Sequence, residues 1–288
     1  MANNTFDQNP LVSVIIPVYN RRAWIAQAVD SVLCQNYKPF ELIVVDDGST
    51  DGTMEILSAY GNKIRVIRQP NSGVSAARNK GAAAAEGNLL AFLDSDDYWL
   101  SGKLAAQVEF FRKNPDIRIC QTEEIWIRKG KRVNPGRRHR KSGGMIFEKS
   151  LELCMISPSA VMMKKDLFDE RGGFDENLPA CEDYDLWLKI TCTEPVGLIN
   201  TPLIVKRGGH PDQLSAAAGL DRFRIQSLLH IMASTRLTDS QYKAAAGVLE
   251  KKCRIYAQGC KKRGKYDEAA YYRKIASTPF SLFPDTSR

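Results

Sequence analysis

Three carboxylates, Asp94, Asp96 and Asp97, occur within four positions, directly after the apolar run of residues 91–93. The apolar run predicts the end of a buried strand, and such strand ends bind ligands in open α/β sheets. Carboxylates this close repel one another unless a cation neutralises them, and oxygen ligands of this kind suit Mg²⁺ or Mn²⁺. The cluster alone leaves two interpretations open, a metal site and an acidic turn.

Other polar side chains stand at predicted strand ends in the same half of the chain. They are Tyr19, the pair Asp46 and Asp47, and Arg78. No GxGxxG follows the first apolar run and no GxxxxGK[ST] is present, which argues against a Rossmann dinucleotide site and a P-loop. What remains is a site that binds phosphate through a metal ion and not through a glycine-rich cradle.

The hydrophobic pattern predicts the elements that position these residues. Apolar runs predict buried strands at residues 12–17, 40–45, 64–67 and 88–93. Spacings of three and four predict helices between and after them, at 24–33, at 53–59, through the alanines to 86, and at 100–113. We expect Ser72 or Ser75 to cap the third helix and Asp97 to cap the fourth. This alternation predicts a parallel sheet with right-handed crossovers.

The second half of the chain is less regular. We expect a hairpin at 122–133, a helix at 146–153, and strands at 159–163 and 198–205. Glu182 and Asp183 open a further helix, where the helix dipole favours acids. From about residue 220 the periodicity is purely helical, and Thr238 with Gln241 forms a capping-box pattern.

These patterns predict an α/β domain at residues 11–219. A small helical appendage follows at 220–276, and tails flank the whole at 1–10 and 277–288. A three-four spaced stripe on the appendage is expected to pack on the main domain, and oligomer formation through these helices is the alternative.

Composition narrows the class of protein. The chain has 288 residues, 43% hydrophobic and 26% charged, which is ordinary for a globular protein. No apolar run approaches the roughly 18 residues of a membrane span, and the polar start lacks a signal core, so we expect a cytoplasmic protein. Seven scattered cysteines without a CxxC pair predict neither a zinc site nor a disulfide framework. Cys34, Cys154 and Cys253 are expected to be small core residues.

The net charge of +8 is concentrated in one segment of the chain. Between Arg128 and Lys141 lie eight Lys or Arg residues and no acid. A local basic segment implies an anionic partner more than a generally basic surface does. We consider an anionic acceptor or peripheral contact with the inner face of an anionic membrane, against a solvated loop. Nucleic acid is not expected, because no aromatic residues are interleaved with the charges in a stacking platform.

Several motifs in order resemble the family 2 glycosyltransferases with the GT-A fold. The resemblance covers roughly residues 11–215 and is carried by the segments VSVIIPVYN at 12–20, VDDGSTD at 45–51, GVSAARN at 73–79, FLDSDD at 92–97 and EDYDLW at 182–187. It implies a Rossmann-like, mostly parallel sheet flanked by helices. It also implies that residues 11–100 form the nucleotide-binding half of the domain and residues 101–219 the acceptor and catalytic half. The implied activity is inverting transfer of a sugar from a nucleotide-sugar donor to a saccharide or lipid-linked acceptor in polysaccharide assembly. UDP is the expected nucleotide because it is common in the family.

The resemblance also implies roles for individual residues. In the donor site, Pro17, Val18 and Tyr19 would line the base pocket, Asp47 would bind the base, and Arg78 would lie beside the base or diphosphate. Asp94 would face the ribose or donor sugar, and Ser95 would be a further donor nucleotide-binding residue. Asp96, in the family's DXD motif, would hold Mg²⁺ or Mn²⁺ on the diphosphate, and His210 matches a position near that metal. Asp183 would be the general base, with Glu182 as the second choice.

Two other functions stay open at this point. One is a catalytically silent nucleotide-sugar-binding protein of the same fold, against which the intact Asp96 and Asp183 argue. The other is a sugar nucleotidyltransferase, which normally needs a basic, glycine-rich phosphate loop near the first strand. Residues 17–20, Pro-Val-Tyr-Asn, do not supply that loop.

Overall fold

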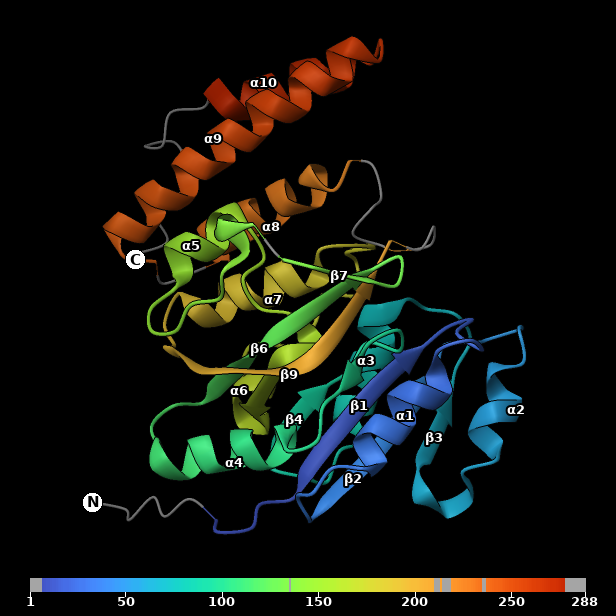
Figure 1. Cartoon of the computed structure of the whole chain (residues 1–288). Coiled ribbons are helices and arrows are strands. Elements are labelled where there is room, and N and C mark those ends of the chain that lie inside the picture. Colours follow the sequence, from blue (N-terminus) through green and yellow to red (C-terminus); the bar gives the residue numbers. More distant parts are fainter. Residues whose placement is uncertain (1–6, 135, 210–212, 214–218, 235–236, 278–288) are drawn as a thin grey trace.

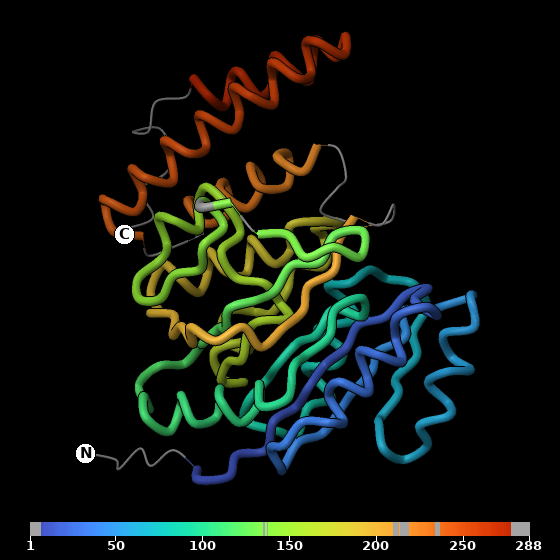
Figure 2. Tube along the Cα trace, in the orientation of Figure 1, coloured from blue at the N-terminus to red at the C-terminus, as the bar shows by residue number. Residues whose placement is uncertain are grey.

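The first half of the chain folds as alternating strands and helices in a computed structural model that describes residues 7–134, 136–209, 213, 219–234 and 237–277 (Figure 1, Figure 2). The strands are β1 Val12–Val18, β2 Phe40–Asp46, β3 Arg65–Arg68 and β4 Leu89–Phe92, and the helices are α1 Ile25–Leu33, α2 Thr53–Ser58 and α3 Val74–Ala83, with a 3₁₀ turn η1 at Gly61–Lys63. Each element lies within a few residues of its predicted position.

The second half adds shorter strands and helices. Its strands are β5 Tyr98–Trp99, β6 Ile119–Arg128, β7 Lys131–Val133, β8 Val161–Lys164 and β9 Val196–Gly208. Its helices are α4 Lys103–Lys113, α5 Phe147–Glu152, α6 Lys165–Glu170 and α7 Glu182–Thr191, with 3₁₀ turns η2 at Arg137–His139 and η3 at Pro158–Ala160. The predicted hairpin is confirmed as β6 and β7, which pair antiparallel around Lys129 and Gly130.

The described strands form one mixed sheet in the order β3-β2-β1-β4-β8-β6-β9-β5, with β7 beside β6. β3, β2, β1 and β4 are parallel, as predicted. Beyond β4 the sheet becomes mixed, because β8 runs antiparallel to both β4 and β6, whereas β6 and β9 pair in parallel. Apolar periodicity marks a strand but not its direction, which depends on partners far along the chain.

Alternate residues of the central strands pack against helices on opposite faces of the sheet. Val14 and Ile16 of β1 join a cluster with α1, α2 and α4, whereas Ile15 joins one with α3, α6 and α7. Both faces are therefore covered, which explains why β1 is apolar at nearly every position.

The helical end of the chain comprises α8 Asp221–Ser234, α9 Asp239–Lys262 and α10 Tyr266–Ser277. Figure 1 shows these three helices at the end of the molecule away from β3 and α2. The capping box of Thr238 and Gln241 is confirmed at the start of α9. Leu249, Cys253 and other members of the predicted stripe are buried against α8, α10, α5 and α7. The stripe is thus core, and association between copies stays a prediction.

Two predicted helix caps are wrong. The N-cap of α3 is Gly73 and that of α4 is Gly102, and neither has a side-chain cap. The carboxylate of Asp47 instead accepts the backbone N–H groups of Ser72 and Gly73, 2.8 and 2.9 Å away, just ahead of α3.

None of the helices in the described ranges has the length and apolar character needed to cross a bilayer.

Candidate active site

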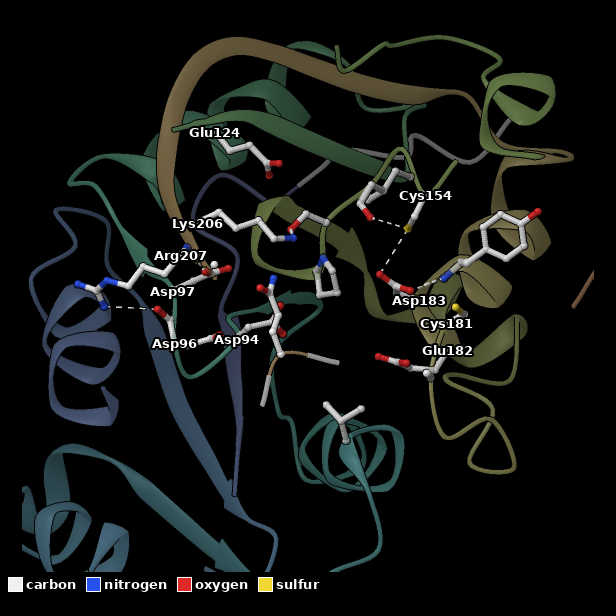
Figure 3. A pocket seen from close by; sticks show the side chains of 18 of the residues that line it. Asp94, Asp96, Asp97, Glu124, Cys154, Cys181, Glu182, Asp183, Lys206 and Arg207 are labelled. Atoms are coloured by element: carbon white, nitrogen blue, oxygen red, sulfur yellow. Dashed lines mark hydrogen bonds between the residues drawn. The ribbon is translucent and has the colours of Figure 1, made fainter. Parts of the chain in front are cut away.

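A cavity of about 470 Å³ opens where β1 and β4 end and where α7 begins. Seven of the predicted site residues line it, and they come from both halves of the chain: Pro17, Arg78, Asp94, Ser95, Asp96, Glu182 and Asp183. β6 and β9 supply a further wall, which the sequence did not point to (Figure 3). His210, the second predicted metal ligand, lies outside the described residues.

Arg78 lies at the centre of the cluster and joins two of the predicted acids. Its guanidinium donates to Oδ1 of Asp94 at 2.7 Å and to Oε1 of Glu182 at 2.6 Å. The side chains of Arg78 and Glu182 are 4% and 7% exposed. Burial disfavours the charged guanidinium, but the two carboxylates outweigh it and raise the pKa of Arg78. The predicted contact of Arg78 with the base or diphosphate remains untested.

The pKa values of the two carboxylates that Arg78 contacts shift in opposite directions. Burial raises the pKa of Glu182 above its usual range, although the charge of Arg78 opposes this. Burial also acts on Asp94, but there Arg78 and Lys206 prevail and lower the pKa of that carboxyl. Because its carboxylate is held by Arg78, Glu182 is a poorer candidate for the general base than its neighbour Asp183.

Asp97 is a structural member of the acidic cluster and does not cap α4. It is 1% exposed, and its carboxylate accepts the Ser159 hydroxyl at 2.7 Å and the Arg207 backbone N–H at 2.8 Å. Burial raises its pKa well above the ordinary value, although Lys206 opposes the shift. These bonds tie the loop after β4 to η3 and to β9. Asp96 remains at the cavity wall, and its backbone carbonyl accepts from Arg207.

Asp183 stands at the start of α7, on the opposite side of the cavity from the loop after β4. Its Oδ2 accepts the thiol of Cys154 at 3.4 Å, and its Oδ1 accepts the backbone N–H of Tyr184 at 2.7 Å. Cys181, just before the helix, has φ of +63°, a conformation that costs free energy for a residue with a Cβ. The chain is therefore held in a strained turn where it presents Glu182 and Asp183.

The expectations for the cysteines are only partly correct. Cys253 is a buried core residue, as predicted. Cys34 is exposed, and Cys154 lines the cavity beside Asp183. The apolar neighbours of Cys154 in the sequence gave no sign of this, because the contact joins residues 29 positions apart.

Lys206, on β9, is a residue of the cavity that sequence reasoning missed. Figure 3 shows its side chain extending from β9 into the cavity. Its Nζ donates to Oγ of Ser157 at 3.0 Å. Burial would lower the pKa of Lys206, but the carboxylates around it, those of Glu124, Asp97, Asp94 and Asp183, raise it. The only signal in the sequence was a lysine directly after an apolar run, the feature that marked Asp94 after β4.

The basic segment does not act as one surface patch. Lys141 is turned inward, 4% exposed, with its Nζ 3.3 Å from Oε2 of Glu124, whose side chain is 8% exposed. Lys129, Lys131 and Arg132 are exposed on the β6–β7 hairpin. The segment therefore divides into a buried cation at the cavity and a charged hairpin outside it.

Three residues predicted to bind the nucleotide do not line this cavity. Val18 is buried in the core and Tyr19 is 45% exposed. Asp47 is buried, and besides the two backbone groups before α3 it accepts Nε2 of Gln69 at 2.7 Å. Its carboxylate thus holds the turn beside the sheet edge, and its predicted contact with the base remains untested.

The described residues contain no group of three or more His, Cys, Asp or Glu side chains placed to hold a metal by themselves. A Mg²⁺ or Mn²⁺ ion on a nucleotide needs only one or two protein carboxylates, because the phosphates supply further oxygens. Asp94 is held by Arg78 and Asp97 by Ser159. Asp96, the metal ligand that the family resemblance implies, lines the cavity and stays the candidate for such an ion.

Comparison with known proteins agrees with this geometry. Residues 13–172 match the model of "Glycosyl transferase family 2". An uncharacterised glycosyltransferase of Rickettsia felis is 38% identical over 194 residues, which cover 67% of this chain but only 32% of the relative. This chain thus spans about a third of the length of that relative.

Two further proteins are covered over most of their length. The Escherichia coli protein named UDP-Glc:alpha-D-GlcNAc-diphosphoundecaprenol beta-1,3-glucosyltransferase WfgD is 32% identical over 202 residues, 68% of this chain and 76% of the relative. The structure of S. aureus TarS 1–349 in complex with UDP-GlcNAc has a TM-score of 0.69 at 18% identity, covering 92% of this chain and 90% of that one. This likeness supports the predicted GT-A fold, and the matches together show that the chain belongs to glycosyl transferase family 2.

Proposed function

We propose that this protein is an inverting glycosyltransferase that moves a sugar from a nucleoside-diphosphate sugar to a saccharide or lipid-linked acceptor. The observation that carries the proposal is the cavity that Asp96 and Asp183 both line, one from the loop after β4 and one from the start of α7. A transferase of this kind needs a site for the leaving diphosphate and a base across from it. The names of the E. coli relative and of the TarS complex favour a UDP-sugar as the donor.

Asp183 is the proposed general base. It takes the proton of the acceptor hydroxyl as that oxygen attacks the anomeric carbon from the face opposite the nucleotide. The bond between that carbon and the diphosphate oxygen breaks, and the nucleoside diphosphate leaves. A well-placed base of this type contributes roughly 10²–10⁴-fold to the rate.

The other residues of the cavity bind and position the donor. Arg78 holds Asp94 in an orientation in which it can face the ribose or the donor sugar. Asp96, with His210 as the further candidate, would hold Mg²⁺ or Mn²⁺. When bound, that ion acts as a Lewis acid that stabilises the negative charge on the leaving diphosphate. Lys206 contributes a fixed positive charge to the same cavity.

The acceptor and the cellular setting belong to the same proposal. The name of the E. coli relative includes a diphosphoundecaprenol-linked sugar, which favours a lipid-linked acceptor and surface polysaccharide assembly. An enzyme of that kind would work in the cytoplasm at the inner face of the membrane. The exposed lysines and arginine of the β6–β7 hairpin suit contact with anionic lipid.

A thermal-shift panel of UDP-, GDP- and dTDP-sugars, each with and without Mn²⁺, tests the function. We expect one class of donor to raise Tm, and Mn²⁺ to enlarge the rise, because a ligand that binds only the native state stabilises it. Release of free nucleoside diphosphate from that donor then separates an enzyme from a silent binding protein. A flat panel would contradict the proposal, and pyrophosphate-dependent formation of a nucleoside triphosphate would identify a nucleotidyltransferase.

A further inference from the structure

The indole of Trp126, on β6, lies where two cavities meet. It lines the main cavity together with Asp183, and it also lines a second cavity of about 230 Å³. Glu124, His139 and Lys141 line both cavities as well. The two cavities therefore share a wall at Trp126, and the second cavity is lined by none of the residues predicted to bind the donor.

The orientation of this indole is held by polar and aromatic contacts. Its Nε1 donates to Oε1 of Glu124 at 2.7 Å. The His139 ring approaches it edge-on, with 5.4 Å between the ring centroids. The guanidinium of Arg128 lies over the indole, with its Cζ 5.6 Å from the ring centroid. A half-buried aromatic ring that is held in one orientation before a ligand arrives loses little conformational freedom on binding.

A buried ion pair holds the carboxylate of Glu124, which accepts the hydrogen bond from Trp126. Nζ of Lys141 lies 3.3 Å from Oε2 of Glu124 and donates to Oε1 of Gln121 at 3.0 Å. Removing two charges from water costs about as much as their attraction returns, so such a pair contributes little net stability. The pair does fix the carboxylate that holds the Trp126 nitrogen, which is a positioning role.

The charges of the second cavity indicate what kind of ligand it fits. Its lining includes two acids, Glu123 and Glu124, and two bases, Arg140 and Lys141. The formal charges balance, so this cavity does not favour an anion. Hydroxyl groups, which both donate and accept hydrogen bonds, match a mixed set of carboxylate, imidazole and guanidinium groups.

We propose that Trp126 is the stacking platform of the acceptor site, and that the second cavity holds the next, uncharged sugar unit of the acceptor. The apolar C–H face of the acceptor pyranose lies on the indole face opposite the Arg128 guanidinium, and its reacting hydroxyl is directed toward Asp183. This inference rests on the proposed function and adds the substrate class, a saccharide of at least two units. It also assigns acceptor recognition to the cavity wall and not to the exposed hairpin charges.

Ligand contact can be read directly on the indole. We would label the protein with 5-fluorotryptophan and record ¹⁹F NMR spectra with a nucleotide sugar bound, assigning Trp126 through Trp126→Phe. The probes are methyl glycosides of glucose, galactose and N-acetylglucosamine and their β-linked disaccharides. We expect at least one disaccharide to shift the Trp126 signal at lower concentration than its monosaccharide, while the buried Trp187 stays unchanged.

Kinetics with any accepted saccharide provide the second readout. Trp126→Ala should raise the acceptor KM about ten-fold with a small change in kcat, as expected for the loss of one aromatic contact. Trp126→Phe should keep most of the affinity. The matched control is Tyr266→Ala, an exposed aromatic residue at the start of α10 that lines neither cavity, and it should leave the acceptor KM unchanged.

The outcomes separate this inference from the proposed function. If no nucleotide sugar shifts Tm or is turned over, the proposed function fails. If a donor binds normally but the whole panel leaves the Trp126 signal unmoved, only the acceptor platform is overturned. A Trp126→Phe variant as defective as Trp126→Ala, or a loss confined to kcat, would also overturn it. The NMR experiment uses the wild-type sequence, so it stands even if Trp126→Ala does not fold.

Discussion

Arg78 and Glu182, which are 104 residues apart in the chain, form a buried ion pair with 2.6 Å between Nη1 and Oε1. Since Arg78 also holds Asp94, one guanidinium connects the loop after β4 with the start of α7. The side of the cavity predicted to bind the donor is thus joined to the side that carries the candidate base. Glu182 accordingly acts as the partner of Arg78, and Asp183 is left to face the cavity.

Replacing Arg78 by Met should destabilise the protein by about 3–5 kcal/mol, because it leaves two carboxylates without their cation at a mostly buried site. Urea unfolding followed by circular dichroism measures the change. Arg65→Met, which removes an exposed arginine 3.9 Å from Glu86, is the control and should have little effect. Equal urea midpoints for Arg78→Met and Arg65→Met would show that the contacts of Arg78 with Asp94 and Glu182 do not stabilise the fold.

Asp183→Asn should lower transfer by roughly 10²–10⁴-fold while the donor-induced rise in Tm persists, because the amide cannot take the proton. Initial rates of nucleotide release, with the acceptor saturating, measure the loss. The control is Asp169→Asn, an exposed acid on α6 outside the cavity. Transfer at near wild-type rate in Asp183→Asn would move the base elsewhere, and Glu182→Gln would then be examined next.

The buried Lys103 should make the free energy of unfolding increase with pH above neutral. Its side chain is fully buried, with Nζ 2.6 Å from Oε1 of Gln107 and 3.9 Å from the centre of the Trp99 ring. Burial lowers the pKa of Lys103 to about 7 from its ordinary 10.5. Between these two values the unfolded chain binds more protons than the native one, so raising the pH favours the native state.

The free energy of unfolding of the wild type should therefore rise relative to that of Lys103→Met between pH 7 and 10, by up to about 1.4 kcal/mol per pH unit. Urea titrations at several pH values measure the difference. Lys113→Met, at an exposed position of the same helix, should leave the slope unchanged. Parallel stability curves for wild type and Lys103→Met would contradict the prediction.

Membrane contact through the hairpin is tested with lipid vesicles. Changing Lys129, Lys131 and Arg132 to Gln should weaken binding to phosphatidylserine vesicles roughly 100-fold at low salt, at about 1 kcal/mol per basic residue near the surface. The control changes Lys261, Lys262 and Arg263, an exposed triplet of the same composition at the end of α9. Sedimentation with vesicles measures binding. Wild-type protein that binds neutral and anionic vesicles equally would end the membrane hypothesis.

The amino-acid sequence by itself determined the local elements and most of the candidate site. Apolar runs located β1, β2 and β4 because buried parallel strands have few polar positions, and a shorter run located the more exposed edge strand β3. Three-four spacing located α1 and α9. The motif segments indicated the family, and they contain the candidate site residues Asp94, Asp96, Arg78 and Asp183. Such local signals suffice where a few neighbouring residues decide the conformation.

The tertiary structure alone decided how these parts meet. β8 lies antiparallel between β4 and β6, an arrangement that no pattern within β8 specifies. Glu182 turned out to be the partner of Arg78, and Asp97 a buried link to Ser159. Lys206 and Trp126 line the cavity because the sheet brings β6 and β9 to the same site as the ends of β1 and β4. Charge pairing and burial depend on which distant residues come within a few ångströms, and this distance follows from the packing of the whole chain.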